Sequence, residues 1–163
     1  MRKRIILLLS IFILASVSCG PYSFSGKALK GIDTVAVPLF ENQTTRYGIR
    51  EELTEEITDA IIEDNTLKVV NIRNADSALR GVITEYRHEC YTFDGSGNCN
   101  EYICRIFVNL VFEDLEKKES IWEEVNLEGY GIYSATNDTE EDGIQSAIDK
   151  LSRDILDKLV KGW

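Results

Sequence analysis

Three long β-type runs joined by two short turns constrain this fold most. The runs span Ala78–Phe93, Tyr102–Leu115 and Ile121–Tyr133. The glycine-rich segment Asp94–Asn98 separates the first two and is a strong hairpin signal; Glu116–Glu119 separates the second two. Runs connected this tightly are expected to pair as an antiparallel meander.

Period-two alternation gives this meander one apolar face. In the last run, Val125 and Leu127 are expected to lie on that face, with Asn126 and Glu128 on the other. In the middle run the apolar face is formed by Ile106, Val108, Leu110 and Phe112. A face of this kind needs a second layer to cover it.

The residues before the meander predict a strand, a helix and a second strand. Thr34–Phe40 is a short β-rich run, in which Pro38 should lie late or at an edge because it has no N–H for a ladder. Apolar residues at helical spacing from Ile49 predict an amphipathic helix ending near Asp64-Asn65. Leu67–Ile72 is the second strand, and so short a connection indicates a parallel crossover.

The chain ends in a second amphipathic helix. Asp138 or Thr139 can cap its start. Its apolar stripe comprises Ile144, Ala147, Ile148, Leu151, Ile155 and Leu159. The predicted order is therefore β-α-β-β-β-β-α. This order indicates an α+β two-layer sandwich, with a mixed sheet of four to five strands and both helices packed on one face, formed by residues 31–163 as a single α/β domain.

The N-terminus predicts export and lipid attachment. Residues 1–18 have a basic start and an apolar run, Ile5–Ala15, that is too short for a bilayer core of roughly 30 Å, as in a signal peptide. Small residues then precede Cys19, a pattern that resembles the lipobox of bacterial lipoproteins. We expect cleavage before Cys19 and acylation of this residue, which would anchor the protein stably. Residues 19–30 are predicted to be the lipidated N-terminus and its tether to the domain.

Charge and residue content exclude several functions. The chain has 28 acidic and 18 basic residues, for a formal net charge of −10, which disfavours nucleic acid as a partner. His88 is the sole histidine and is expected to face solvent, so chemistry that needs two histidines is excluded. Gly95-Ser96-Gly97 fits a hairpin turn better than a nucleophile or phosphate loop. No catalytic residue, resident metal or cofactor is predicted, and the protein is not expected to be an enzyme.

Three cysteines remain once Cys19 is acylated, and cysteines of exported proteins tend to pair. If the first hairpin is centred near Gly97, Cys90 and Cys104 come roughly opposite each other, and a disulfide between them is the leading prediction. If Cys99 lies in the turn, Cys90–Cys99 is the alternative. Free thiols are a third arrangement. A zinc site with His88 is the least favoured, because the spacing matches no common zinc module.

Basic residues are sparse in the predicted meander. Lys117 and Lys118 form the only basic tip between long strands, and Arg87 and Arg105 are expected to face each other across the first hairpin. Such groups could contact lipid A phosphates or carboxylates. The alternative for the lysines is a solvated turn.

Several segments together resemble the lipopolysaccharide-assembly lipoprotein family, LptE. The strand and first helix of this pattern also occur in other envelope lipoproteins, such as LpoB-like activators of peptidoglycan synthases and CsgG-like secretion proteins. The long meander directly after the second strand favours LptE, and the short linker from Cys19 to Ile32 argues against an activator. The resemblance rests on Cys19–Gly26, Ile32–Thr45, the helix carrying Glu52-Leu53-Thr54-Glu55, Ala75-Asp76, Gly81–Ile83, Trp122–Glu124 and the closing helix to Trp163.

This resemblance implies a non-enzymatic role at the outer membrane. LptE-like proteins plug the LptD β-barrel, help it fold and, with it, deliver lipopolysaccharide to the cell surface. The protein is then expected to be lipid-anchored on the periplasmic side of the outer membrane, a placement that Gly20 after Cys19 also favours. Family members contact lipopolysaccharide through basic residues, for which Lys117 and Lys118 are the candidates here. The alternative function is that of a peptidoglycan-synthase activator or another envelope interaction lipoprotein.

Overall fold

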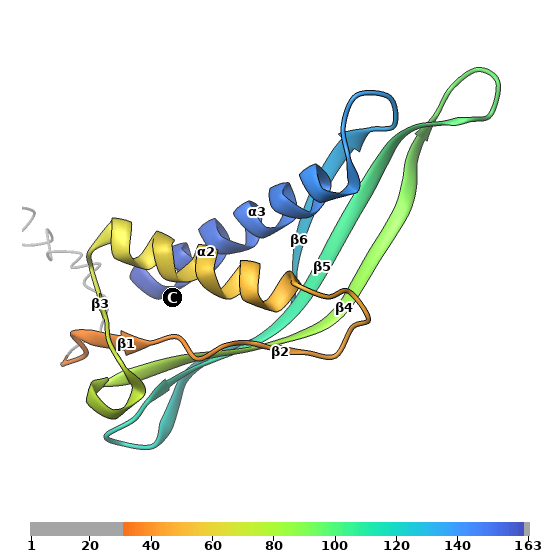
Figure 1. The fold of residues 1–163 in the computed structure, drawn as a ribbon. Helices are drawn as coiled ribbons and strands as arrows, with labels where there is room; N and C mark the ends of the chain where they lie inside the picture. The colour runs from red at the N-terminus through yellow and green to blue at the C-terminus, as the bar shows by residue number, and fades with distance from the viewer. Residues whose placement is uncertain (1–30, 162–163) are drawn as a thin grey trace, which may run out of the picture.

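A computed structural model describes residues 31–161 of the 163-residue chain. The predicted signal peptide 1–18, the acylation site Cys19 and the tether 19–30 lie outside the described residues. Within them, two long helices cover one face of a twisted sheet, and the other face is left open (Figure 1). The predicted α+β two-layer fold with both helices on one face is confirmed.

The sheet has six strands in mixed orientation. They follow the order β3-β1-β4-β5-β6, with β2 also pairing with β4. β1 is parallel to β3 and β4, β2 is parallel to β4, and the β4–β5 and β5–β6 pairs are antiparallel. The strands are β1 (Thr34–Ala36), β2 (Glu41–Asn42), β3 (Lys68–Val69), β4 (Ser77–Phe93), β5 (Cys99–Asp114) and β6 (Glu119–Ser134). A short 3₁₀ turn, η2 (Ile72–Asn74), precedes β4.

The predicted strand Thr34–Phe40 is divided into two. β1 ends at Ala36 and β2 begins at Glu41, and both pair with the same edge of β4. Pro38 lies in the gap between the two strands, where its lack of an N–H costs no ladder hydrogen bond. Phe40 turns inward, and its ring lies 2.2 Å from where a Cβ on Gly81 would be, so this position of β4 accepts only glycine. This division accounts for the sixth strand.

The first helix, α2 (Ile49–Asp64), has the predicted boundaries. Every fourth residue along one face, from Ile49 through Leu53 and Ile57 to Ile61, is buried. Asn65 ends the helix in the left-handed conformation and donates its N–H to the carbonyl of Ile61.

The second helix, α3 (Glu140–Lys161), starts with the predicted cap at Thr139. The Thr139 and Asp142 side chains each accept the other's backbone N–H, a reciprocal pair that satisfies two free donors of the first turn. The whole predicted stripe is at most 1% exposed. It comprises Ile144, Ala147, Ile148, Leu151, Ile155 and Leu159.

Helix α3 packs so closely on β6 that the backbones of the two elements are in contact. Gly129 and Gly131 of β6 face it, and a Cβ on Gly131 would lie 2.1 Å from the carbonyl oxygen of Gly143. Val125, which was predicted to continue the apolar face, is instead 72% exposed. The ladder shifts register between Val108 and Leu110, and Asn126 has a φ of 62°. This irregularity moves Val125 off the helix-covered face.

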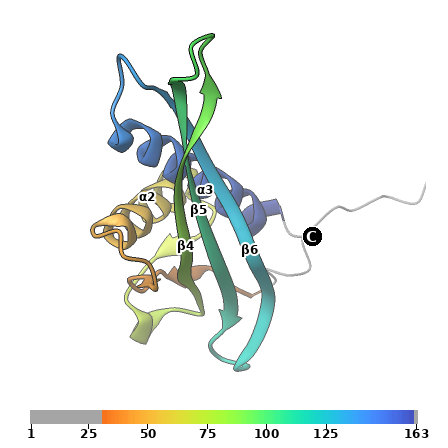
Figure 2. The ribbon, with the colours of Figure 1, turned by 90° about the vertical axis from the view of Figure 1, so that its right-hand side faces the viewer.

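The β4–β5 hairpin extends beyond the helices (Figures 1 and 2). We call residues 87–105 the arm, because Arg87 and Arg105 are opposite each other in the ladder, and the helix-covered remainder the body. On its outer edge, β4 pairs with β2 only as far as Ile83. Beyond it, no other strand of the described chain pairs with β4 on that side. The arm tip and the β5–β6 turn lie at opposite ends of the sheet (Figure 1).

Candidate interaction surfaces

A disulfide closes the arm near its tip. It joins Cys90 to Cys99, and Cys104 is a buried free thiol. The leading prediction, Cys90–Cys104, is therefore wrong, and the alternative, Cys90–Cys99, is the one formed. The hairpin register is the reason, because it sets Cys104 opposite His88 and Cys90 opposite Tyr102.

Beside this disulfide, a polar cluster joins the arm to the start of α3. His88 Nε2 lies 2.7 Å from the Tyr133 hydroxyl of β6, and its Nδ1 lies 3.7 Å from a Glu140 carboxylate oxygen. Tyr86 donates to the other Glu140 oxygen at 2.7 Å. The rings of His88, Tyr102 and Tyr133 are mutual neighbours, with centroids 5.0–5.8 Å apart. His88 is therefore part of a contact network and faces solvent only in part.

The chemistry of this cluster is that of a structural contact between the arm and α3. Burial raises the pKa of the Cys104 thiol, so the thiolate that a nucleophile needs is disfavoured. Burial, followed by the hydrogen bonds with Cys104 and Glu140, raises the pKa of Tyr86 far above its usual range. No group of three His, Cys, Asp or Glu side chains that could hold a metal ion occurs within residues 31–161. The zinc hypothesis also loses two of its ligands, because Cys90 and Cys99 form the disulfide.

The open sheet face carries arginines that are already paired. Arg87 and Arg105 are opposite each other, as predicted, but Arg87 is bound by Glu85 and Arg105 by Glu128. The Arg87 guanidinium also lies 5.1 Å from the centre of the Phe107 ring. The predicted basic pair is therefore neutralised and helps to cover the apolar central strand.

The predicted basic tip lies at the β5–β6 turn, away from the arm tip. Lys117 binds the Asp114 carboxylate, which also accepts the backbone N–H groups of Glu116 and Lys117. These contacts, with the Lys117 side chain first, hold the pKa of Asp114 below its usual range. No described residue forms an ion pair with Lys118, so it is the more available of the two lysines.

Two exposed aromatic residues near the arm tip were not predicted as functional. Tyr91 is 50% exposed and Phe93 is 66% exposed, next to the disulfide. Their place in the strand just before a turn signal is the sequence feature that could have marked them. Large exposed rings on a cross-linked hairpin are suited to contact with another molecule.

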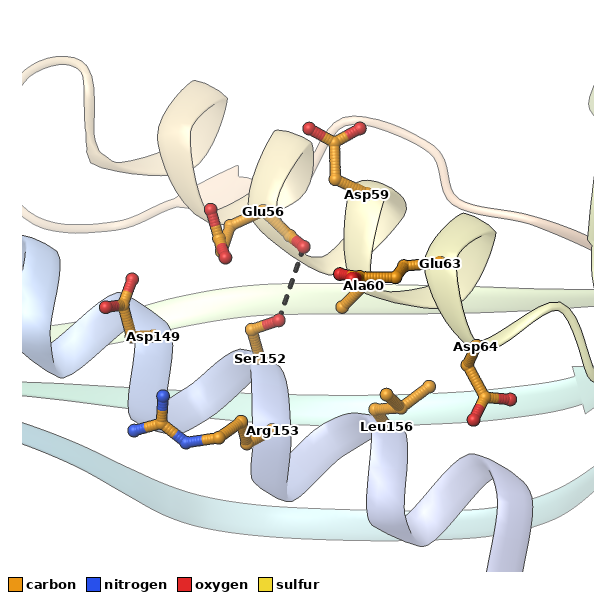
Figure 3. Close-up of a pocket in the computed structure, with 9 residues that line it drawn as sticks. All are labelled: Glu56, Asp59, Ala60, Glu63, Asp64, Asp149, Ser152, Arg153 and Leu156. Atoms are coloured by element: carbon orange, nitrogen blue, oxygen red, sulfur yellow. Dashed lines mark hydrogen bonds between the residues drawn. The ribbon is translucent and has the colours of Figure 1, made fainter.

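The outer surface of the helix layer is acidic. Between α2 and α3 lies a shallow hollow of about 340 Å³ (Figure 3). Ser152 forms its floor and donates to the backbone carbonyl of Glu56 at 3.3 Å, which ties the two helices together. Five acidic residues and one base line the hollow, namely Glu56, Asp59, Glu63, Asp64, Asp149 and Arg153. The hollow carries four more acidic than basic side chains and so accounts for part of the acidic surplus of the chain.

The fold and these surfaces define a class of protein: a two-layer α+β domain with one open sheet face and a projecting hairpin. No helix of residues 31–161 is long and apolar enough to cross a membrane. The family model for lipopolysaccharide assembly, LptE, matches residues 32–160. This chain belongs to the LptE family, and the match supports an LptE-like envelope lipoprotein.

Solved structures share the fold at low sequence identity. A hypothetical protein, CT253, from Chlamydia trachomatis has a TM-score of 0.60 at 14% identity, over 81% of this chain and 97% of that one. A minor lipoprotein from Acinetobacter baumannii has a TM-score of 0.52 at 16% identity, over 79% and 93%. The rare lipoprotein B from Shewanella oneidensis has a TM-score of 0.50 at 17% identity, over 76% and 92%. No curated protein sequence matches this chain.

Proposed function

We propose that this protein is an outer-membrane lipoprotein, anchored on the periplasmic side through Cys19, that plugs and helps to assemble an LptD-like β-barrel for lipopolysaccharide transport. The observation that carries the proposal is the LptE family match over residues 32–160. The role is non-enzymatic and needs no cofactor. It also fits the polar cluster, in which burial raises the pKa of the Cys104 thiol and of the Tyr86 phenol.

The dimensions of the sheet support a plug. A strand rises about 3.3 Å per residue, so the 17 residues of β4 extend roughly 55 Å. A bilayer with its headgroups is about 40–45 Å thick. Strands of this length can follow the depth of a barrel lumen, with the tether keeping the domain close to the membrane and its local concentration near the barrel high.

The test is extraction of the tagged, full-length protein from its native envelope in mild detergent, with mass spectrometry of the proteins that co-purify. A large outer-membrane β-barrel in near-equal amount is expected. A penicillin-binding protein without a barrel would overturn the proposal in favour of the activator function. The matched control is Cys19→Ser, which cannot be acylated. This variant should be depleted from the membrane fraction and should co-purify with less barrel, because no lipid concentrates it at the membrane.

Direct lipopolysaccharide contact through Lys117 and Lys118 is a separate part of the proposal. Lys118 should contribute more, because Lys117 is already bound to Asp114. We expect Lys118→Glu to weaken lipopolysaccharide binding about tenfold, the effect of losing one charge-assisted hydrogen bond of about 1.5 kcal/mol. Lys68→Glu is the control, because it makes the same charge change at an exposed site on β3. Equal losses in the two variants would reject this contact site.

A further inference from the structure

The distal arm, which we define as residues 89–101, carries two large aromatic side chains that are largely in solvent. They are Tyr91 and Phe93, the latter with two thirds of its surface exposed. Both lie in β4 next to the Cys90–Cys99 disulfide, beyond the part of the sheet that the helices cover (Figures 1 and 2). Exposed rings of this size are candidates for contact with another molecule.

The distal arm is held in shape without a core of its own. The disulfide Cys90–Cys99 joins its two strands behind the turn. Within the turn, the Asp94 carboxylate accepts the backbone N–H groups of Ser96 and Asn98, and the Asp94 N–H donates to the Asn98 carbonyl. Rings on a scaffold that is already ordered lose little conformational entropy on binding, so they are suited to act as anchors.

The distal arm is also uniformly acidic. It contains Glu89, Asp94 and Glu101 and no Lys, Arg or His. None of these three carboxylates forms an ion pair with another residue of 31–161. Their negative charge, which surrounds the two rings in sequence, is therefore available to cations that another molecule supplies.

We propose that the distal arm is a docking element for a protein with an apolar pocket rimmed by Lys or Arg side chains. Phe93 and Tyr91 enter the pocket, and the three acids meet the basic rim. Aromatic anchors at the centre and charged groups at the rim are the common arrangement of protein interfaces. This inference goes beyond the proposed function, because it names a surface and the chemistry of its partner and does not require that partner to be the barrel.

The same features disfavour the other occupants of such a surface. The turn at the apex, residues 94–98, is polar and would have to enter a bilayer ahead of the rings. Anionic lipid headgroups and nucleic acid would both be repelled by the acids, and a second copy would bring like charges together. A basic protein surface is the occupant that the rings and the charges favour together.

Photo-crosslinking in the native envelope tests the proposal, with the tagged, full-length protein carrying a benzophenone amino acid in place of Tyr91. One dominant product with a second protein is expected. In this background Phe93→Ala should lower the yield about tenfold, as the loss of an interface anchor does. Val125→Ala is the control, because Val125 is equally exposed but lies in the body, and it should leave the yield unchanged. Both positions are in solvent, so neither variant should impair folding.

A second pair of variants tests the charge of the partner. In isolated envelopes, the yield should fall several-fold between about 50 and about 300 mM salt, and Glu89→Lys should lower the yield and flatten this fall. Glu119→Lys makes the same charge change at the opposite end of the sheet and should do neither. Mass spectrometry of the product should place a Lys or Arg of the partner beside the linked site. Changing that residue to Glu should lower the yield, and Glu89→Lys should restore it.

Every other outcome overturns the proposal. A product with lipid would assign the distal arm to the membrane, and a product that joins two copies would assign it to self-association. A yield that is insensitive to Phe93→Ala or to salt would remove the anchor or the charge from the interface. The absence of any product would mean that the distal arm is free in the envelope. Co-purification of a barrel is a separate readout, so failure of this inference and failure of the proposed function are distinguishable.

Discussion

The body and the arm share strands β4 and β5 but are stabilised by different interactions. The body buries a continuous aliphatic core between two helices and the sheet. In the arm, only Ile103 and Cys104 are buried apolar residues. The arm relies instead on the Cys90–Cys99 disulfide and the ring and hydrogen-bond contacts of His88. A hairpin too thin to exclude water needs covalent and polar constraints, whereas a covered sheet does not.

The largest expected effect is on the core of the body. Ile148→Ala removes a fully buried side chain of α3 and should lower the free energy of unfolding by about 2–5 kcal/mol, through lost burial and a cavity. Urea denaturation gives the value. Ile62→Ala, at a half-exposed position of α2, should change it by about 0.5 kcal/mol or less. Similar losses for the two variants would mean that the helix layer does not stabilise the body as described.

Removing the disulfide should affect the arm alone. In Cys90→Ser/Cys99→Ser, the closed loop of nine-residue separation is lost, a constraint of about 2–3 kcal/mol on the chain-entropy model. Because little of the core lies in the arm, we expect amide exchange to rise from Arg87 to Arg105 and to stay unchanged in α3. A comparable rise in α3 would contradict the division into body and arm.

Two glycine-to-alanine variants compare how much space the body and the arm leave for an added methyl group. Gly131→Ala places a methyl group against the Gly143 backbone and should destabilise the protein by about 1–3 kcal/mol. Gly95→Ala, in the arm turn, meets nothing within 4 Å and should be close to neutral. Thermal unfolding of the two variants checks this. Tolerance of both changes would show that α3 is not held against β6 as closely as described.

The smallest expected effect is a pH dependence of the body. The Thr34 hydroxyl and the backbone N–H groups of Asp33 and Thr34 hydrogen-bond the Asp76 carboxylate and hold its pKa below the usual range. The stabilisation is therefore present above the ordinary pKa of about 3.9 and is lost as the pH falls through the lowered value. Asp76→Asn should flatten the fall of the urea midpoint between about pH 5 and 2.5.

Asp94 provides the matching test in the arm. Hydrogen bonds from Asn98 and Ser96 hold the pKa of Asp94 below its usual range. Asp94→Asn should change acid-dependent amide exchange near the tip and leave the urea midpoint as it is. The comparison would be contradicted if the urea midpoint of Asp76→Asn fell with pH as steeply as that of the unmodified protein. It would also be contradicted if Asp94→Asn changed the pH dependence of the urea midpoint.

The elements predicted best from the sequence are those whose apolar residues all pack against a single surface. Ile49 to Ile61 and the α3 stripe each pack against one sheet face, so helical spacing identified them correctly. Prediction was wrong where the ladder is irregular. Val125 follows the alternation, but the backbone at Asn126 takes it off the covered face.

The candidate surfaces were harder to predict than the fold. Hairpin register decides which cysteines meet, and it sets Cys104 opposite His88, two residues before Cys90, so that Cys90 bonds to Cys99 instead. The pairing of Arg87 with Glu85 and of Arg105 with Glu128 depends on the same ladder. An apolar groove lined by Leu39, Val82 and Val111 forms at the gap between β1 and β2. The uninterrupted β-rich run Thr34–Phe40 gives no sign of that gap.

The register shifts in β4 also determine how the arm can lie beside other proteins. Its outer edge beyond Ile83 has unpaired backbone groups, the feature by which sheets merge and aggregate. Shifts at Ile83/Glu85 and at Cys90/Thr92 interrupt the pleat at both ends of Glu85–Cys90. A foreign strand could therefore align with that stretch alone. An arm that offers so short an edge can lie against the strands of another protein without merging into their sheet.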